Sequence, residues 1–150
     1  MRGSVRREVT IAVDTAAAWA VVGRPDVLHL WFPDIVDCAV EGDRRTVTLA
    51  SGLAMDERIL TNDPIQRRFQ YRVEGGMFTE HLATVDVIGL PDRNCLVTYS
   101  SDADPAPLAV VLGGATARAL AELRSQLESG RGPALDAVRD LHATSEGAPS

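Results

Sequence analysis

The stretch Pro107–Ser129, PLAVVLGGATARALAELRSQLES, decides the fold because it is the longest helical pattern in the chain. Small and apolar side chains recur in it at steps of three and four residues, which predicts a helix with one buried stripe. At 1.5 Å per residue this helix is roughly 34 Å long, enough to cross a small domain. The stripe comprises Leu108, Val111, Leu112, Ala115, Ala119, Leu123 and Leu127.

Both ends of this helix are marked in the sequence. Two aspartates and two prolines mark its start and suit a first turn with unpaired N–H groups, while Gly130 and Gly132 follow it. Inside the helix, the pair Gly113-Gly114 costs about 1 kcal/mol of helix stability per glycine relative to alanine. Two interpretations stay open: the glycines allow close packing of the helix on a sheet, or they leave room for a ligand.

Ahead of this helix, the chain is predicted to form one strand, two short helices and six further strands. Val5–Val13 alternates as a strand, Asp14 is placed as the N-cap of a short helix, and the second short helix is DVLHLWF, Asp26–Phe32. From Ile35 onward, short alternating segments are separated by turn residues, which predicts an antiparallel meander. The order β-α-α-β6-α predicts an α+β fold, in which a curved seven-stranded antiparallel sheet surrounds the long C-terminal helix.

The length and composition fit a single globular domain. The chain has 150 residues, of which 45% are hydrophobic, so it can bury a core without disulfides. We place the domain at residues 1–130 and a loosely held tail with one short amphipathic helix at residues 131–150. Leu135, Val138 and Leu141 of that helix are expected to dock on the domain or on a second copy, so the protein is expected to be a monomer or a homodimer.

Charge and motif content argue against several partners. The net charge is −6 with both signs interspersed, so nucleic acid is not an expected partner. All 15 basic residues are arginines, which excludes lysine Schiff-base chemistry. The histidines lack metal-binding spacing and no glycine-rich nucleotide motif follows a strand, so we expect no metal and no cofactor. Without a signal-peptide pattern or a long apolar run, a cytoplasmic protein with no membrane span is expected.

Five segments of the predicted sheet carry a family pattern: GDRRTVTLASG (Gly42–Gly52), MDERIL (Met55–Leu60), RRFQYRV (Arg67–Val73), HLATVDV (His81–Val87) and VTYSSD (Val97–Asp102). With the Asp14 to Trp19 helix start, they resemble the bacterial polyketide cyclase/dehydrase branch of the START and Bet v 1-like superfamily, which has the helix-grip fold. The resemblance covers about Val5 to Ser129. It implies a cavity for a small hydrophobic or aromatic, polyketide-like molecule and, in an enzyme, cofactor-free cyclisation or dehydration.

Strand alternation indicates which side chains face this cavity. Met55 and Ile59 form the apolar phase of the fourth strand, and Glu57 lies between them on the same face. Phe69 and Tyr71 share the inward face of the fifth strand. The expected ligand-binding residues from the strands, the second short helix and the long helix are Met55, Ile59, Phe69, Tyr71, Tyr99, Trp31 and Leu112.

The sixth strand gives conflicting indications for His81 and Glu80. Its more apolar phase places His81 inward, but a two-residue turn at Gly75-Gly76 pairs Tyr71 with Glu80 instead. A longer turn or a bulge at the start of the strand restores the first arrangement. The related family motif also carries a large side chain at the position of His81. We therefore expect His81 in the cavity, with Glu80 as the alternative.

Glu57 and His81 are the candidate catalytic pair, expected on strands separated by one neighbour and roughly 10 Å apart. Desolvation raises the pKa of a carboxyl among apolar side chains toward the range useful near neutral pH. The alternative is a Glu57 satisfied by an arginine, by Tyr71 or by a buried water. Three functions remain: a cyclase or dehydratase whose substrate Tyr71 and Tyr99 orient, a non-catalytic carrier or sensor of a hydrophobic ligand, and a protein-interaction module with a filled core.

Overall fold

Seven antiparallel strands form one continuous sheet. The strands are β1 (Gly3–Ile11), β2 (Ile35–Glu41), β3 (Arg44–Leu49), β4 (Ala54–Asp63), β5 (Arg68–Val73), β6 (Glu80–Leu90) and β7 (Asn94–Asp104). Their order across the sheet is β1-β7-β6-β5-β4-β3-β2, so the meander is continuous and β1 joins its far edge. The computed structural model describes residues 1–146, and of residues 141–146 it describes the backbone alone. The predicted α+β architecture is confirmed.

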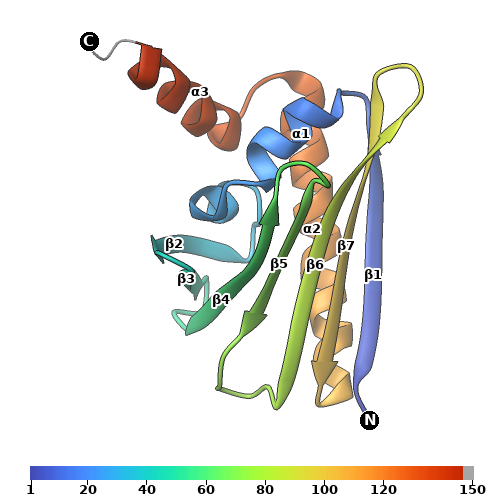
Figure 1. Cartoon of the computed structure of the whole chain (residues 1–150). Helices are drawn as coiled ribbons and strands as arrows, with labels where there is room; N and C mark the ends of the chain where they lie inside the picture. Colours follow the sequence, from blue (N-terminus) through green and yellow to red (C-terminus); the bar gives the residue numbers. More distant parts are fainter. Residues whose placement is uncertain (147–150) are drawn as a thin grey trace.

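The helices, including the one in the C-terminal segment, lie where the sequence places them. They are α1 (Thr15–Val22), the 3-10 helix η1 (Pro25–Leu30), α2 (Ala106–Ser129) and α3 (Pro133–Glu146). The sheet curves around α2, which packs mainly on β1 and β7 (Figure 1). By length and composition α2 is apolar enough to cross a membrane, but it is the core helix of this helix-grip fold. It ends at Gly130, whose φ of 69° is left-handed and suits glycine.

The predicted buried stripe of α2 is correct only in its C-terminal two thirds. Ala115, Ala119, Leu123 and Leu127 are buried, but Leu108 and Leu112 are half-buried, and Val111 is 68% exposed. The reason is geometric: α2 rests on the strands at one end of the sheet, β1 and β7, so its first turns lie over a space that no core side chain fills. The prediction of one continuous buried stripe is therefore wrong for the first turns.

The two glycines of α2 have different surroundings. A Cβ added at Gly113 would lie 2.8 Å from Cγ2 of Val5 and 3.2 Å from Nη2 of Arg7, both on β1. At Gly114 the nearest atom would be Nη1 of Arg118, at 3.7 Å. Neither glycine lines the cavity described below. Close packing of the helix on the sheet, one of the two interpretations left open, therefore explains Gly113.

Helix α3 is held more firmly than the expected loose tail. Ala134 and Val138 are buried, Leu135 is packed against the core, and α3 contacts α1 and η1. The buried amide of Gln126 on α2 donates to the Leu30 carbonyl at 2.9 Å and accepts the Ala134 N–H at 3.0 Å. The side chain of Leu141 and residues 147–150 lie outside the described residues. The domain boundary at residue 130 stays a prediction.

Substituting each glycine of α2 by alanine separates helix propensity from packing. We expect Gly114→Ala to raise the free energy of unfolding by about 0.5 to 1 kcal/mol, because alanine is the better helix former and the site has room. Gly113→Ala gains the same propensity but forces Val5 to move, so it should be less stable than Gly114→Ala by about 1 kcal/mol or more. Urea denaturation of both variants measures this. Equal gains would contradict the close packing of α2 on β1.

Candidate functional site

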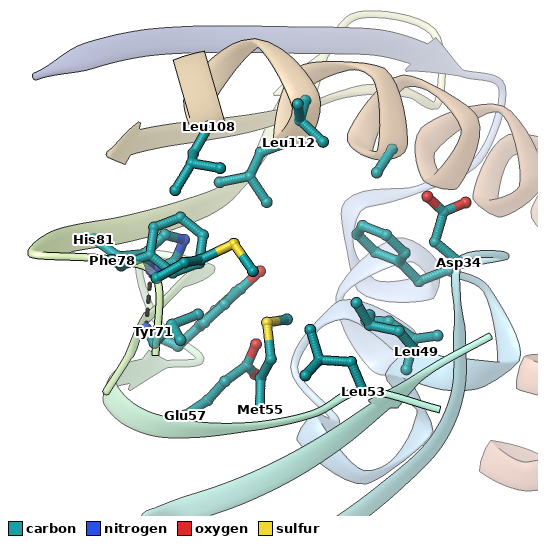
Figure 2. A pocket seen from close by; sticks show the side chains of 16 residues that line it. Asp34, Leu49, Leu53, Met55, Glu57, Tyr71, Phe78, His81, Leu108 and Leu112 are labelled. Carbon is teal, nitrogen blue, oxygen red and sulfur yellow. Dashed lines mark hydrogen bonds between the residues drawn. The ribbon is translucent and has the colours of Figure 1, made fainter. Parts of the chain in front are cut away.

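A cavity of about 220 Å³ lies between the first turns of α2 and the inner face of the sheet. Figure 2 shows Leu108 and Leu112 facing Glu57 and Met55 across it, with His81 and Phe78 at one end. Most of the lining is apolar. The lining residues are Phe32, Asp34, Ile35, Leu49, Leu53, Met55, Glu57, Tyr71, Val73, Met77, Phe78, His81, Leu108, Val111, Leu112 and Ala115.

Glu57 forms a buried ion pair with Arg45. The two residues are directly opposite on β3 and β4, and they are 2% and 4% exposed. Nε of Arg45 donates to Oε1 of Glu57 at 2.7 Å. Nη2 lies 2.7 Å from the same oxygen without forming a hydrogen bond, which makes it a close charge contact. Glu57 therefore faces the cavity, as strand alternation predicts, and the alternative that an arginine satisfies it is also correct.

The surroundings of Arg45 explain how the charge is kept in the core. Its guanidinium carbon lies 4.7 Å from the ring centre of Tyr71 and 5.4 Å from that of Phe69, which is cation–π geometry. Its Nη1 donates to the Pro25 carbonyl at 3.2 Å. Burial raises the pKa of the Glu57 carboxyl above its ordinary value, and the attraction to Arg45 opposes that rise. Arg45 thus favours the carboxylate form of Glu57 against the effect of burial.

Tyr71 and Tyr99 form a buried pair of phenols. Their hydroxyl groups are hydrogen-bonded to each other, and their rings meet edge to face with centroids 6.5 Å apart. Tyr71 lines the cavity, whereas Tyr99 lies behind it in the core. Burial raises the pKa of both phenols, so both are neutral at physiological pH. One of the two hydroxyl protons forms the hydrogen bond between the tyrosines, so the second proton is available to a ligand.

His81 points inward and is fixed by the backbone of the neighbouring strand. It is 7% exposed, and its Nδ1 accepts the Val73 N–H at 2.9 Å. In the neutral ring, Nε2 therefore carries the proton and can donate it. Burial lowers the pKa of His81 to about 4, so the ring is neutral near pH 7. The His81 ring centroid lies 5.8 Å from that of Tyr71 and 5.1 Å from that of Phe78.

The conflict over Glu80 is resolved by the length of the connection before β6. β5 ends at Val73 and β6 begins at Glu80, so the turn is longer than two residues and Tyr71 pairs with Ala83. Glu80 faces outward and forms an ion pair with Arg2. The prediction that His81 faces inward is confirmed, and the same connection brings Met77 and Phe78 to the cavity.

The structure brings five of the predicted site residues to the cavity: Glu57, His81, Tyr71, Met55 and Leu112. The other four do not line it. Tyr99, Phe69 and Trp31 are buried core residues, and Ile59 is partly buried. Beyond Glu57 the space is filled by the Arg45 side chain against Phe69, which separates this part of the sheet from the cavity. Trp31 packs against Tyr99, and its neighbour Phe32 lines the cavity instead.

Sequence reasoning missed Arg45, the residue that sets the electrostatics of the site. The alternation Arg45, Val47, Leu49 on β3 was the available signal, because Val47 is fully buried on the same face. An arginine in that phase is usually assigned to solvent. Among the described residues, no group of three or more His, Cys, Asp or Glu side chains is arranged to hold a metal ion.

The pKa of His81 predicts a specific loss of stability in acid. The folded protein keeps the ring neutral down to about pH 4, whereas the unfolded chain takes up the proton near pH 6.5. Between these values the unfolded state binds more protons, so stability falls as the pH decreases. The contribution is at most about 3 kcal/mol. His81→Gln retains an acceptor for Val73 and should lose this part of the decline in urea titrations at pH 6.5 and 4. Parallel curves for both proteins would contradict it.

Comparison with known proteins supports the fold and assigns the family. An uncharacterised protein of Bacillus thuringiensis is 21% identical, with a TM-score of 0.77, over 83% of this chain and 98% of that one. A START superfamily protein of Mycobacterium smegmatis is 19% identical, with a TM-score of 0.68, over 85% and 99%. Norcoclaurine synthase from Thalictrum flavum, solved with dopamine and hydroxybenzaldehyde, is 16% identical, with a TM-score of 0.71, over 89% and 90%.

The family match rests on a family model rather than on a likeness to one protein. No curated protein matches the sequence. The model of a family described as polyketide cyclase / dehydrase and lipid transport matches residues 2–131. That range contains the whole sheet, helix α2 and every residue of the cavity. The protein therefore belongs to the polyketide cyclase / dehydrase and lipid transport family.

Proposed function

We propose that this protein binds one small hydrophobic molecule, with one or two rings, in the cavity between α2 and the sheet. The observation that carries the proposal is the cavity itself, which is apolar along most of its lining and has a few polar groups. At about 220 Å³ it is smaller than the roughly 300 to 1,000 Å³ of pockets for drug-sized ligands, so a compact ligand fits it best.

The pairing of the polar groups supports binding as the principal role. Glu57 is held by Arg45, the hydroxyl of Tyr71 is bonded to Tyr99, and Nδ1 of His81 is bonded to Val73. Groups fixed in this way orient a ligand without being free to reorganise. The third function considered, a protein-interaction module, predicted a filled core, and the cavity argues against it. A cytoplasmic location, the absence of a cofactor and the oligomeric state stay predictions.

Filling the cavity tests the proposal. Ala115 lines the cavity, and Ala117 on the same helix is exposed. With 2-naphthol as the probe, isothermal titration should detect binding to the wild-type protein and to Ala117→Leu. Binding to Ala115→Leu should be weaker by about tenfold or more, because the added side chain occupies ligand space. Equal affinity in both variants would place the ligand elsewhere, and no binding to the wild type by this or similar neutral aromatics would refute the proposal.

Native mass spectrometry of the purified protein complements this test. A small hydrophobic molecule that stays bound in the gas phase and is released on denaturation identifies a natural ligand, and the same spectrum gives the oligomeric state. We expect the retained compound to be absent from Ala115→Leu and present in Ala117→Leu. A compound retained by both variants would contradict binding in the cavity.

Proton transfer on the bound ligand is a second candidate function. It is favoured by one observation: Glu57 and His81 both line the cavity, on strands β4 and β6 that flank Val73 of β5. Neutral His81 can donate a proton from Nε2 to a carbonyl oxygen, and the carboxylate of Glu57 can accept one from the adjacent carbon. Such an arrangement is suited to enolisation, a step of cyclisation and dehydration.

Deuterium exchange tests this second function without a known substrate. 2-Tetralone is a neutral bicyclic ketone with acidic C–H bonds, and its exchange in deuterated buffer is followed by NMR. If the cavity catalyses enolisation, Glu57→Gln should lower the exchange rate by about 100-fold or more and His81→Ala by less. Exchange by the wild-type protein at the buffer rate, or full activity in Glu57→Gln, would rule this function out and leave the binding role intact.

A further inference from the structure

The cavity lining contains a carboxylate whose balancing cation lies outside the lining. Glu57 lines the cavity, but Arg45 does not: it lies on the far side of the carboxylate, against the rings of Tyr71 and Phe69. Both contacts from Arg45 fall on Oε1 of Glu57, so Oε2 is the oxygen left for a ligand. Figure 2 shows the Glu57 carboxyl in the wall between Met55 and Tyr71. A ligand therefore meets an acceptor that carries little net charge.

The other ionisable groups along the cavity are also balanced or neutral. Asp34, at the opposite end, accepts two hydrogen bonds from Arg118 of α2, at 3.2 and 2.7 Å. His81 presents Nε2–H, because Nδ1 is bonded to the backbone of Val73. Tyr71 presents a hydroxyl bonded to Tyr99. The cavity thus offers a donor at His81, an acceptor at Glu57, the hydroxyl of Tyr71, and no unbalanced charge among its described residues.

This pattern favours a neutral ligand on physical grounds. A charged group that enters an apolar cavity loses its hydration and needs an opposite charge in return. An ammonium group beside Glu57 would also be repelled by the Arg45 cation on the other side of the carboxylate. A carboxylate on the ligand would be repelled by Glu57 itself. A hydroxyl group suffers neither repulsion, since it donates to Oε2 of Glu57, while an oxygen elsewhere on the same ligand accepts from His81.

We infer that Arg45, although it lines no part of the cavity, determines the charge of the ligand: it makes the site selective for neutral, hydroxyl-bearing aromatic molecules over amines and carboxylates of the same shape. The inference rests on the proposed binding function and adds the substrate class. Arg45 acts through Glu57 and is a specificity-determining residue without a ligand contact.

Three probes of one shape test the inference. 4-Hydroxyphenethyl alcohol, tyramine and 4-hydroxyphenylacetate share the phenol ring and differ in a terminal alcohol, ammonium or carboxylate. Their affinities are measured by isothermal titration at about pH 8, where the amine stays protonated. The wild-type protein should bind the alcohol about tenfold or more tightly than either ion. Equal binding of tyramine and the alcohol by the wild-type protein would overturn the inference.

Opposite charge variants make the test specific to the ion pair. Arg45→Met removes the cation that balances Glu57, so a bound ammonium ion can take its place beside the carboxylate and the ratio of affinities should move toward tyramine by about tenfold. Glu57→Gln leaves Arg45 unbalanced and should move the ratio toward 4-hydroxyphenylacetate by a similar factor. The double variant restores a neutral site and the preference for the alcohol. If one single variant fails to fold, the other single variant and the double variant still decide the question.

The control is Arg58→Met, which changes the net charge of the protein by the same amount. Arg58 is the next residue after Glu57 on β4, lies on the other face of the sheet, and pairs with Asp43 and Glu74 at 2.7 Å. It should leave the three affinities in the wild-type ratio. A shift in Arg58→Met equal to that in Arg45→Met would attribute the effect to overall charge and overturn the inference. If the wild-type protein binds neither 2-naphthol nor any of the three probes, the proposed function itself is refuted.

Discussion

The buried contact between Arg45 and Glu57 is the constraint on which the rest of the site depends. Two charges removed from water are stable only while each has its partner, and breaking such a pair typically costs about 3 to 5 kcal/mol. This pair links β3 to β4, reaches η1 through the Pro25 carbonyl, and supports the ring of Tyr71. The end of the cavity opposite the long helix is therefore built around charge, although its surface is mostly apolar.

The cavity exists because α2 is fastened to one side of the sheet. Gly113 lets the helix approach β1 closely, and its C-terminal half packs into the core through Leu123 and Leu127. On the strands opposite, Met55, Glu57 and Tyr71 face Leu108 and Leu112 across the open space of the cavity (Figure 2). Fold and binding site thus have one cause, the off-centre position of the helix on a curved sheet.

Periodicity predicted the architecture well because apolar side chains repeat with a different period in helices and in strands. Alternation on β4, β5 and β6 correctly placed Glu57, Tyr71 and His81, since a strand has only two faces. It did not find Arg45, because the rule that assigns charged side chains to solvent outweighs alternation in a short strand. Nor did it separate cavity from core: Phe69 and Tyr71 share one face of β5, and only the neighbouring Arg45 decides which of them a ligand can reach.

Gln126 has a consequence for how this chain is divided. Its amide oxygen accepts the N–H of Ala134, and its amide nitrogen donates to Leu30, so three helical segments converge on one side chain. The family match ends at residue 131, inside the span of these bonds. The segment that matches the family is therefore shorter than the unit needed to pair the buried amide of Gln126. In this chain that unit includes α3, which packs against α1 and η1 and stabilises the end of the fold remote from the cavity.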